Sequence, residues 1–370
     1  MNKKLLFITY THSLGGGAEK ILTNIVNGLA AQTDYEISVL EYARFQTKNS
    51  ILNDEIKVLK PVVDMSSSSR IKRIFKMLLV HISPCILRKI YYKDNYDTVI
   101  SFNYQIPSFL TPFKKSVDNI QWIHGDIYDL KSKPFKRMLQ SISFKKADKI
   151  VAISENTKKS ILDIFPQYKE KIRTIYNGTD VKLIEELSDA PTDIKLKENS
   201  MIFLGRLEPN KNPLKLIKYT ERLIKEGMNV NLYLLGTGVQ QEEVIQYINS
   251  IGMEDRIKAL GYISEPYPII RQSRAVCLLS ESEGFPTVLT EGLALGKPFI
   301  STKIGGVREL SNNGKCGIIV NDYKDFKKAV SDIIFDDTKY AQMTTDCKEH
   351  IKLFSYNQQI GNIIKLIEHT

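Results

Sequence analysis

The sequence predicts an α/β protein of two domains, each built on a parallel sheet, and three observations support this prediction. The chain has 370 residues, and about 150 residues per domain suggests two domains. Short apolar runs alternate with helical patterns throughout, as in repeating strand–helix units. Most runs are continuous stretches of Ile, Val, Leu and Phe, which is typical of strands buried on both faces of a parallel sheet.

Thirteen apolar runs predict the strands of the two sheets. The runs of the first half are Lys4–Tyr10, Glu36–Tyr42, Ile56–Leu59, Thr98–Phe102, Ile120–His124, Ile150–Ser154 and Ile172–Asn177. Those of the second half are Met201–Gly205, Asn229–Gly236, Ile257–Tyr262, Ala275–Ser280, Pro298–Thr302 and Gly317–Val320. Helical patterns lie between the runs; the segment Glu19–Ala30, for example, carries its apolar residues on one stripe.

A polar stretch near residues 180–200 predicts the boundary between the domains. We expect a first Rossmann-like domain over residues 1–182 and a second over residues 195–350, facing each other across a cleft. Residues 351–370 continue a helical spacing of apolar side chains and are predicted to form a last helix.

The composition is that of an ordinary globular protein, with 42% apolar and 25% charged residues. This excludes a disordered chain, a collagen-like chain and a small disulfide scaffold. The four cysteines, Cys85, Cys277, Cys316 and Cys347, form no C-x-x-C pair, so we expect free thiols in a reducing compartment. No apolar run reaches the roughly 18 residues of a membrane span, and the short run at the start indicates a strand rather than a signal peptide. We therefore expect a cytoplasmic protein.

Positive charge is concentrated in the first half of the chain. Residues 1–184 hold 29 basic and 17 acidic side chains, a balance of +12, whereas residues 185–370 hold 23 and 25, a balance of −2. The first half is therefore expected to face or adjoin something anionic.

A run of three glycines, Gly15–Gly17, follows the first predicted strand and opens a helix. Glycines allow the backbone to approach a ligand closely, and a helix N-terminus offers unpaired N–H groups to an anion. We expect contact with a phosphate or a sugar; a plain βα turn is the structural alternative. The run is not a G-x-G-x-x-G fingerprint, and the nearest match, Gly236-Thr237-Gly238, lacks the third glycine.

Arg206 and Lys211 lie on the loop after the first strand of the second predicted domain. Ligands of open α/β sheets bind beyond the carboxyl ends of strands, where these two cations could neutralise two phosphates. The alternative is a pair of solvated surface cations.

The segment 281–292 follows the strand predicted at Ala275–Ser280. Pro286 suits a first helical turn, so the N–H groups of Thr287 and its neighbours would point toward an anion. Glu283 precedes this helix and Glu291 lies in its second turn. Two carboxylates at this spacing can hold hydroxyl groups at opposite ends of one polar ligand. Arg206 and Lys211 would offset the negative charge of these carboxylates beside a phosphate. The alternative is a capped surface helix.

His124 ends the strand predicted at Ile120–His124. A lone histidine there is often structural. Its position at a carboxyl end of the first sheet, facing the expected cleft, favours a role in binding.

On these residues the chain resembles the retaining glycosyltransferases of family 4, which have the two-domain GT-B fold. The principal motif is Glu283 followed, after seven residues, by Glu291, with Gly284-Phe285-Pro286 between them. Supporting matches, in the family's order and from end to end of the chain, are Gly16-Gly17-Ala18-Glu19, His124, Tyr176-Asn177-Gly178-x-Asp180 and Gly205-Arg206…Lys211. The resemblance implies an acceptor domain, then a nucleotide-sugar donor domain, and a last helix that crosses back onto the first domain.

The resemblance also implies a role for each matching residue. Arg206 and Lys211 would bind the donor diphosphate, Glu283 would contact the donor sugar and Glu291 the ribose. Gly16 and Gly17 would approach the phosphate of the donor. The backbone of Gly284, Phe285, Pro286, Thr287 and Val288 would contact the sugar and the phosphate. Tyr262 and Ile263 would contact the base. His124 would bind the transferred sugar through its 6-hydroxyl.

The resemblance implies a nucleotide-sugar substrate, with uridine diphosphate as the default. The sequence has no D-x-D triplet, the motif with which the other glycosyltransferase fold commonly binds a metal, so we expect no metal and no cofactor. Front-face retention needs no protein nucleophile, so Glu283 is expected to position the sugar rather than to attack it. The acceptor is expected to be a polyprenyl-linked surface glycan of the bacterial type.

Two basic, apolar-rich segments then suggest a peripheral position on the inner face of the cell membrane. Residues 70–93 hold seven Lys and Arg with no acid, and residues 131–149 hold seven more against one acid. Amphipathic basic helices bind the interface of anionic membranes. An ordinary solvated face is the alternative.

Two other functions are alternatives to a transferase. A nucleotide-dependent oxidoreductase on paired Rossmann domains would need the absent G-x-G-x-x-G. A non-catalytic basic protein that binds membrane or nucleic acid would not need acids paired with Arg206 and Lys211 at strand ends, an arrangement that suits a small ligand. We therefore expect no nucleic-acid partner.

Overall fold

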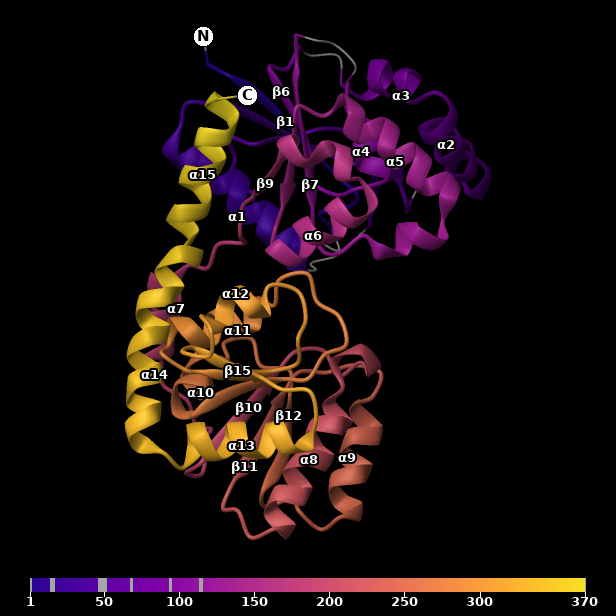
Figure 1. Cartoon of the computed structure of the whole chain (residues 1–370). Coiled ribbons are helices and arrows are strands. Elements are labelled where there is room, and N and C mark those ends of the chain that lie inside the picture. The colour runs from indigo at the N-terminus through magenta and orange to yellow at the C-terminus, as the bar shows by residue number, and fades with distance from the viewer. Residues whose placement is uncertain are drawn as a thin grey trace. The chain divides into compact units, whose positions relative to one another are not determined.

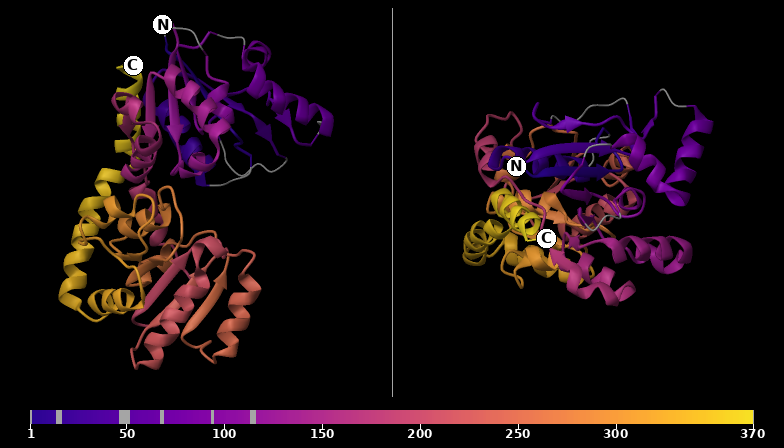
Figure 2. Two further views of the ribbon diagram at one scale, coloured as in Figure 1. Left: turned by 45° about the vertical axis from the view of Figure 1, so that its right-hand side comes forward. Right: turned by 90° about the horizontal axis from the view of Figure 1, so that it is seen from above.

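The computed structural model describes residues 2–13, 17–45, 52–66, 69–92, 95–112 and 116–369. The chain forms two compact units: unit 1 holds residues up to Tyr176 together with the residues from Gln359 onward, and unit 2 holds Asn177–Gln358. Figures 1 and 2 show helices on both faces of the large sheet of each unit.

The large sheet of unit 1 is parallel and has the strand order β4-β2-β1-β6-β7-β8-β9. Its strands are β1 (Lys4–Thr9), β2 (Glu36–Glu41), β4 (Lys57–Val58), β6 (Thr98–Ser101), β7 (Asp118–Ile123), β8 (Lys149–Ala152) and β9 (Ile172–Thr174). A second, two-stranded sheet pairs β3 (Ala43–Arg44) with β5 (Val63–Asp64).

The helices of unit 1 cover this sheet on two sides. They are α1 (Gly17–Gln32), α2 (Arg70–Ile82), α3 (Pro84–Tyr91), α4 (Ile106–Phe109), α5 (Pro134–Lys146), α6 (Glu155–Ile164) and α15 (Tyr356–Glu368), with 3-10 turns η1 (Tyr128–Ser132) and η2 (Pro166–Lys171). Figure 1 shows α1 and α15 to the left of the sheet and α2, α3, α4 and α5 to its right.

The sheet of unit 2 is also parallel, with the order β12-β11-β10-β13-β14-β15. Its strands are β10 (Ser200–Leu204), β11 (Asn231–Leu235), β12 (Ile257–Gly261), β13 (Ala275–Leu278), β14 (Phe299–Ser301) and β15 (Gly317–Ile319). Its helices are α7 (Val181–Ser188), α8 (Pro213–Lys225), α9 (Gln241–Ser250), α10 (Tyr267–Gln272), α11 (Thr287–Ala294), α12 (Val307–Ser311), α13 (Tyr323–Ile334) and α14 (Asp337–His350), with 3-10 turns η3 (Pro209–Lys211) and η4 (Ile351–Phe354).

The predicted fold class is confirmed, because each of the thirteen apolar runs contains a strand of one of two parallel sheets. Several strands are shorter than the runs that predicted them; β9, for example, ends at Thr174 rather than Asn177. The apolar run continues past the strand because the residue after it, Ile175, is also buried. The small β3–β5 sheet was not predicted, since a strand of two residues has no periodicity to read.

The limits of the units differ from the expected domain limits of 1–182, 195–350 and 351–370. Residues 177–182 belong to unit 2, where the Thr179 N–H donates to Phe354 O (2.8 Å) and the Thr179 hydroxyl donates to Thr290 Oγ1 (2.6 Å). The turn η4 belongs to unit 2 as well. From Gln359 onward the last helix lies in unit 1, where Lys3 Nζ donates to Ile367 O (2.6 Å).

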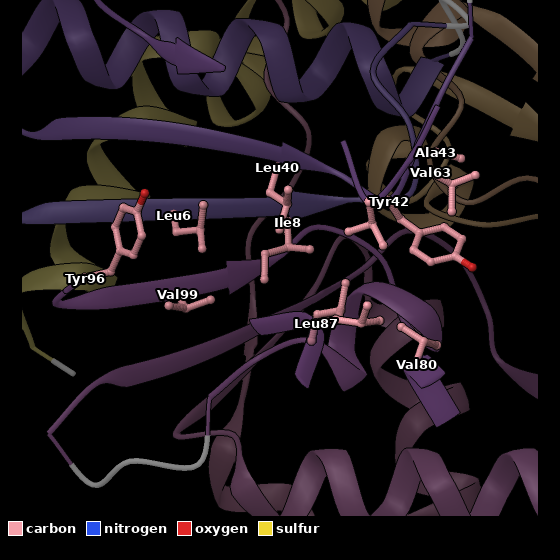
Figure 3. Close-up of a cluster of buried hydrophobic side chains, with 12 residues drawn as sticks. Leu6, Ile8, Leu40, Tyr42, Ala43, Val63, Val80, Leu87, Tyr96 and Val99 are labelled. Atoms are coloured by element: carbon pink, nitrogen blue, oxygen red, sulfur yellow. The ribbon is translucent and has the colours of Figure 1, made fainter. Parts of the chain in front are cut away.

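The core of unit 1 joins the sheet to the α2–α3 segment. Leu6 and Ile8 of β1 and Val99 of β6 lie in one buried cluster with Val80 of α2 and Leu87 of α3 (Figure 3). A second cluster lies under α5 and α6 and includes Ile150, Phe144 and Ile161. The single tryptophan, Trp122 on β7, is fully buried and so reports on the packing of this unit.

Shortening Leu6 to alanine should destabilise unit 1 by about 2–5 kcal/mol, because the fully buried side chain leaves a cavity in the sheet core. Unfolding by denaturant, followed by Trp122 fluorescence, measures this change. Leu78→Ala is the matched control, since Leu78 is 50% exposed and its loss should change the free energy of unfolding by no more than about 0.5 kcal/mol. Equal effects of the two substitutions would contradict the assignment of Leu6 to the core.

Candidate functional site

The loops that could bind a ligand in unit 2 all follow the carboxyl ends of its parallel strands. Residues 205–212 follow β10, residues 236–240 follow β11, residues 279–286 follow β13 and residues 302–306 follow β14. Because the strands are parallel, these loops leave the sheet at one edge, which is where open α/β sheets bind their ligands.

An ion pair joins the two predicted residues at the centre of this edge. Lys211 Nζ donates to Glu283 Oε1, and the two side chains are 18% and 15% exposed. The Ser280 hydroxyl donates to the same carboxylate oxygen (3.0 Å). Residues 72 positions apart in the sequence thus form a largely desolvated charged group, and the pairing limits the cost of burying each charge.

Hydrogen bonds to main-chain oxygens hold the loop of Lys211 against the loop of Glu283. The Glu281 N–H donates to Asn210 O (2.8 Å), and Asn212 Nδ2 donates to Leu279 O (3.1 Å). Asn212 adopts left-handed backbone angles (φ 52°, ψ 45°), which end the turn η3 and direct Lys211 toward Glu283. The position of the ammonium group is therefore set by the backbone rather than by the flexible side chain alone.

Glycines allow a third loop to pack against the loop of Arg206. A Cβ atom on Gly236 would lie 1.9 Å from Gly205 O, and one on Gly238 would lie 2.4 Å from Leu207 O. The Leu207 N–H donates to Thr237 O (2.9 Å). In the sequence, Gly236-Thr237-Gly238 is an incomplete match to a dinucleotide fingerprint. In the structure its two glycines allow two strand-end loops to lie in close contact.

Another glycine pair, Gly305-Gly306, fixes the backbone of Glu283 and was missed in the sequence. A Cβ atom on Gly305 would lie 2.5 Å from Glu283 O, and one on Gly306 would lie 2.3 Å from the Phe285 ring. The Thr302 hydroxyl adds a hydrogen bond to Ser280 O (2.6 Å). A usable signal was present, because the two glycines follow the strand predicted at Pro298–Thr302.

The helix predicted after Glu283 is α11, and its start differs slightly from the prediction. Pro286 is the N-cap residue (φ −76°, ψ 97°) and lies outside the first turn, because its backbone is extended rather than helical. Thr287 and Val288 begin the helix, so their N–H groups have no intrahelical acceptor, and the helix dipole places partial positive charge there. Glu291 lies in the second turn, as predicted from its spacing, and it is half-buried.

Arg206 and Tyr262, two further predicted donor-site residues, lie at the same edge but are more exposed. Arg206 forms an ion pair with Glu208 (2.6 Å), and its side chain is 73% exposed. Tyr262 follows β12 at the end of the sheet and is 75% exposed, with Ile263 half-buried beside it in the chain. The structure thus joins Lys211 to Glu283 directly, whereas Arg206 is held by Glu208.

In unit 1 a cavity of about 460 Å³ lies at the carboxyl ends of β1, β6 and β7. His124, the residue after β7, is part of its wall. The full lining is Thr9, Tyr10, Thr11, Ala18, Glu19, Asn103, Tyr104, Gln105, Ile106, Pro107 and His124. The mixture of hydroxyl, amide and carboxyl groups on an apolar base suits a hydroxylated ligand.

The imidazole of His124 is buried among aromatic rings. Its ring centroid lies 4.3 Å from that of Phe102 and 6.4 Å from that of Trp122. Burial lowers its pKa to about 3, so the ring is neutral near pH 7. Nε2 has no hydrogen-bond partner among the residues that the structure describes. A buried polar atom without a partner costs free energy, so a ligand hydroxyl in the cavity would satisfy it.

The glycine run lies partly outside the described residues, and Gly16 is among those not described. Gly17 begins α1 and is exposed, and a Cβ atom there would meet nothing within 4 Å. The next residues, Ala18 and Glu19, line the cavity with His124. Helix α1 therefore begins within the glycine run and beside the cavity, slightly before the segment Glu19–Ala30 that predicted it.

A buried carboxylate, Glu41 at the end of β2, fixes the backbone that leads into the glycine run, and sequence reasoning missed it. Glu41 is 3% exposed and accepts hydrogen bonds from the His12 N–H (2.8 Å) and from Arg44 Nε (2.6 Å). His12 Nε2 lies 2.8 Å from Thr23 Oγ1 on α1. Strand β2, the loop after β1 and helix α1 are thereby connected through Glu41 and His12 together.

Two other kinds of site are absent from the described ranges. These residues contain no group of three or more His, Cys, Asp or Glu that could hold a metal ion. Nor do they include a helix with the length and hydropathy needed to cross a bilayer.

The sequence matches two known families, which together cover most of the chain. Residues 15–183 match "Glycosyltransferase Family 4", and residues 185–350 match "Glycosyl transferases group 1". The chain is 30% identical over 185 residues to the Campylobacter jejuni "N-acetylgalactosamine-N,N'-diacetylbacillosaminyl-diphospho-undecaprenol 4-alpha-N-acetylgalactosaminyltransferase"; this covers 50% of the chain and 49% of that relative. It is 24% identical over 379 residues, 98% of each protein, to the C. jejuni "GalNAc-alpha-(1->4)-GalNAc-alpha-(1->3)-diNAcBac-PP-undecaprenol alpha-1,4-N-acetyl-D-galactosaminyltransferase".

Solved structures of glycosyltransferases share the fold from end to end. Anabaena HepE in complex with UDP has a TM-score of 0.75 at 19% identity, covering 99% of this chain and all of that one. The lipopolysaccharide outer core galactosyltransferase WaaB in its apo form has a TM-score of 0.72 at 21% identity, covering 98% and 99%. With two matched families, two parallel-sheet units and relatives that are glycosyltransferases, the resemblance seen in the sequence is confirmed: the chain is an enzyme of the family 4 glycosyltransferases, with the GT-B fold.

Proposed function

We propose that this protein is a retaining transferase that moves a hexose or an N-acetylhexosamine from a UDP-sugar to a lipid-linked surface glycan. The observation that supports this proposal most directly is the Lys211–Glu283 pair beside the N-terminus of α11. It combines a cation and free N–H groups, which suit a diphosphate, with a carboxylate, which suits sugar hydroxyls.

Cleavage of the bond between the anomeric carbon and the diphosphate builds negative charge on the leaving oxygens. In the proposed site Lys211, Arg206 and the N–H groups of Thr287 and Val288 stabilise that charge. Because the loops of Lys211 and Glu283 are fixed to each other by hydrogen bonds to the main-chain oxygens of Asn210 and Leu279, these groups need little reorganisation during the reaction. On binding, the diphosphate would compete with Glu283 for Lys211, leaving Glu283 free to hold a sugar hydroxyl.

The remaining roles follow from the family resemblance and stay proposals. Glu291 holds the ribose hydroxyls, Tyr262 and Ile263 contact the base, and Gly16 and Gly17 approach the phosphate. His124 accepts or donates a hydrogen bond at the 6-hydroxyl of the transferred sugar, for which its neutral, unpartnered Nε2 is suited. We expect no metal and no protein nucleophile.

The acceptor and the location are inferred from the relatives. Both C. jejuni proteins are named for acceptors on diphospho-undecaprenol or PP-undecaprenol. A polyprenyl-linked acceptor lies in a membrane, so we place this enzyme in the cytoplasm, peripherally on the inner face of the cell membrane. The oxidoreductase and the non-catalytic binding protein gain no support from the family assignment.

UDP should raise the unfolding temperature of the protein, and the rise should persist in EDTA. Ligand at 100 times its dissociation constant stabilises the folded state by about 2.7 kcal/mol, which a thermal-shift panel with UDP, GDP, ADP, NAD and several UDP-sugars resolves. A shift with NAD alone would contradict the donor assignment, and a UDP shift that disappears in EDTA would contradict metal independence.

Replacing Lys211 by methionine should lower kcat/KM with the best UDP-sugar by on the order of 10²–10³-fold, because a charge contact to the leaving diphosphate is lost. Lys225→Met is the matched control, since Lys225 pairs with Glu221 on the exposed surface of α8 in the same unit. Glu283→Gln should also lower the rate without changing the anomer of the product, which NMR identifies. An inverted product from the unaltered enzyme would contradict the retaining mechanism.

Neutral His124 should make unit 1 less stable as the pH falls. Its pKa is about 3 when folded and about 6.5 when unfolded. Between these values the unfolded chain binds more protons, so the free energy of unfolding drops, by about 2 kcal/mol from pH 7 to pH 5. His124→Gln should remove this part of the pH dependence, as measured by Trp122 fluorescence during denaturant unfolding. An unchanged slope would show that His124 is not buried and neutral.

A further inference from the structure

The loop after β6 forms a large part of the wall of the unit 1 cavity. Residues 103–107 are five of the eleven described residues that line it. The rest come from the end of β1, from the start of α1 and from His124. The chemistry of this one loop therefore decides much of which ligand fits the cavity.

The backbone of the loop is strained at Gln105. This residue has φ 64° and ψ −120°, a combination that residues with a side chain rarely adopt. Strained residues persist where their surroundings hold them, and they gather at ligand-binding sites. Both polar groups of the Gln105 main chain are held: its N–H donates to Gln140 Oε1 (2.8 Å), and its carbonyl oxygen accepts from the Ser108 hydroxyl (2.7 Å).

A chain of buried amides stands behind Gln105. Gln140 of α5 and Gln121 of β7 are both fully buried. Gln140 Nε2 donates to Gln121 Oε1 (3.2 Å), and Gln121 Nε2 donates to Ser143 Oγ (2.7 Å). Gln140 thus connects the strained residue to the sheet and to α5, which fixes the loop relative to the strand ends that complete the wall.

Asn103, two residues before Gln105, is fixed through its amide oxygen. Asn103 Oδ1 accepts hydrogen bonds from the Tyr10 N–H (3.0 Å) and from the Thr9 hydroxyl (3.1 Å). Because a main-chain N–H can only donate, the bond from Tyr10 decides which end of the amide is oxygen. Asn103 Nδ2 makes no hydrogen bond to a described residue. Its two N–H groups are therefore available to a ligand in the cavity.

The rest of the wall favours a neutral ligand that has an apolar group. The described lining contains no Lys or Arg, and Glu19 contributes a carboxyl group, so an anionic ligand is disfavoured. Ile106 and Pro107 add apolar atoms on the same loop as Asn103. An N-acetyl group combines a carbonyl oxygen, which accepts from N–H donors, with a methyl group, which prefers an apolar surface. A hydroxyl group at the same position of a sugar ring has no methyl group to bury.

We propose that the unit 1 cavity binds an N-acetylhexosamine and that Asn103 determines this specificity by donating to the N-acetyl carbonyl oxygen. The methyl group would pack against Ile106 and Pro107. Gln140 is a positioning residue, because it acts through Gln105 and does not line the cavity. This inference rests on the proposed function, which leaves a hexose and an N-acetylhexosamine open, and it selects the second.

Saturation-transfer NMR with simple glycosides tests this specificity. The probes are the methyl α-glycosides of GalNAc, GlcNAc, galactose and glucose, each added to the full-length protein. The two N-acetyl glycosides should bind about tenfold more tightly than the hexosides, because they add a hydrogen bond and an apolar contact. Their N-acetyl methyl protons should receive the largest saturation. Equal affinities for the two kinds of glycoside, or no saturation of any of them, would overturn the proposal.

The variant Asn103→Asp separates recognition from a merely structural role. A carboxylate oxygen still accepts from Tyr10 and Thr9, so the loop stays anchored, but the amide N–H donors are lost. The preference for N-acetyl glycosides should fall about tenfold. Hexosides should still bind, since their hydroxyl groups can donate to the carboxylate. Asn249→Asp, on the exposed surface of α9, is the matched control and should change nothing. An unchanged preference in Asn103→Asp would show that Asn103 only holds the loop.

Two substitutions at Gln140 test the positioning role. Gln140→Leu should weaken binding of the N-acetyl glycosides roughly fivefold, because the Gln105 N–H loses its acceptor. Gln140→Glu should restore it, since a buried carboxyl group is protonated and can accept from Gln105 while donating to Gln121. Equal losses in the two variants would contradict a role that acts through these hydrogen bonds.

UDP and UDP-sugars identify the source of the bound sugar and keep this proposal separate from the proposed function. Asn103→Asp should leave the thermal shift with UDP unchanged, because the nucleotide site is assigned to unit 2. If this variant weakens binding of UDP-GalNAc or UDP-GlcNAc relative to UDP, the cavity holds the sugar of the donor. If it weakens binding of the methyl glycosides alone, the cavity holds the terminal sugar of the acceptor. A missing UDP shift in the unaltered protein would contradict the donor assignment, whereas the glycoside preference still decides the specificity of the cavity.

Discussion

The candidate donor site depends on the ion pair between Lys211 and Glu283. Neither charge would be stable alone at such low exposure, because desolvation of an unpaired ion costs several kcal/mol. Each loop is therefore held in place partly by the other, with Asn210 and Asn212 adding backbone contacts. A diphosphate that enters the site can replace Glu283 as the anionic partner of Lys211. The ammonium group of Lys211 is therefore paired with a negative charge both before and after the ligand binds.

The site also requires the main chains of neighbouring loops to lie very close together. At Gly236 and Gly305 a side chain would overlap the carbonyl oxygens of Gly205 and Glu283. Four strand-end loops can thus pack side by side around the ion pair, at the edge where the parallel strands end. The precision of the site comes from this backbone packing, since long side chains such as Lys lose much rotamer freedom when they are fixed.

Unit 1 buries a polar side chain beside its cavity and exposes apolar side chains on its outer surface. The cavity contains a neutral histidine with an unsatisfied nitrogen, which favours an uncharged, hydroxylated ligand over a phosphate. Helix α2 leaves apolar side chains in water and turns Arg73 and Lys76 inward. Both features lower the stability of the free protein, and each would be compensated by a partner of matching chemistry.

The sequence by itself determined the two parallel sheets, the strand-end positions of His124, Lys211 and Glu283, and the family, because continuous apolar runs and motif spacing are local properties of the chain. Only the tertiary structure decided which strand-end groups meet. It paired Lys211 with Glu283 but Arg206 with Glu208, and it moved residues 177–182 into unit 2 through Thr179. It also turned the stripe of α2 outward, a choice that periodicity cannot reveal, since a stripe of the same spacing fits a core or a partner equally well.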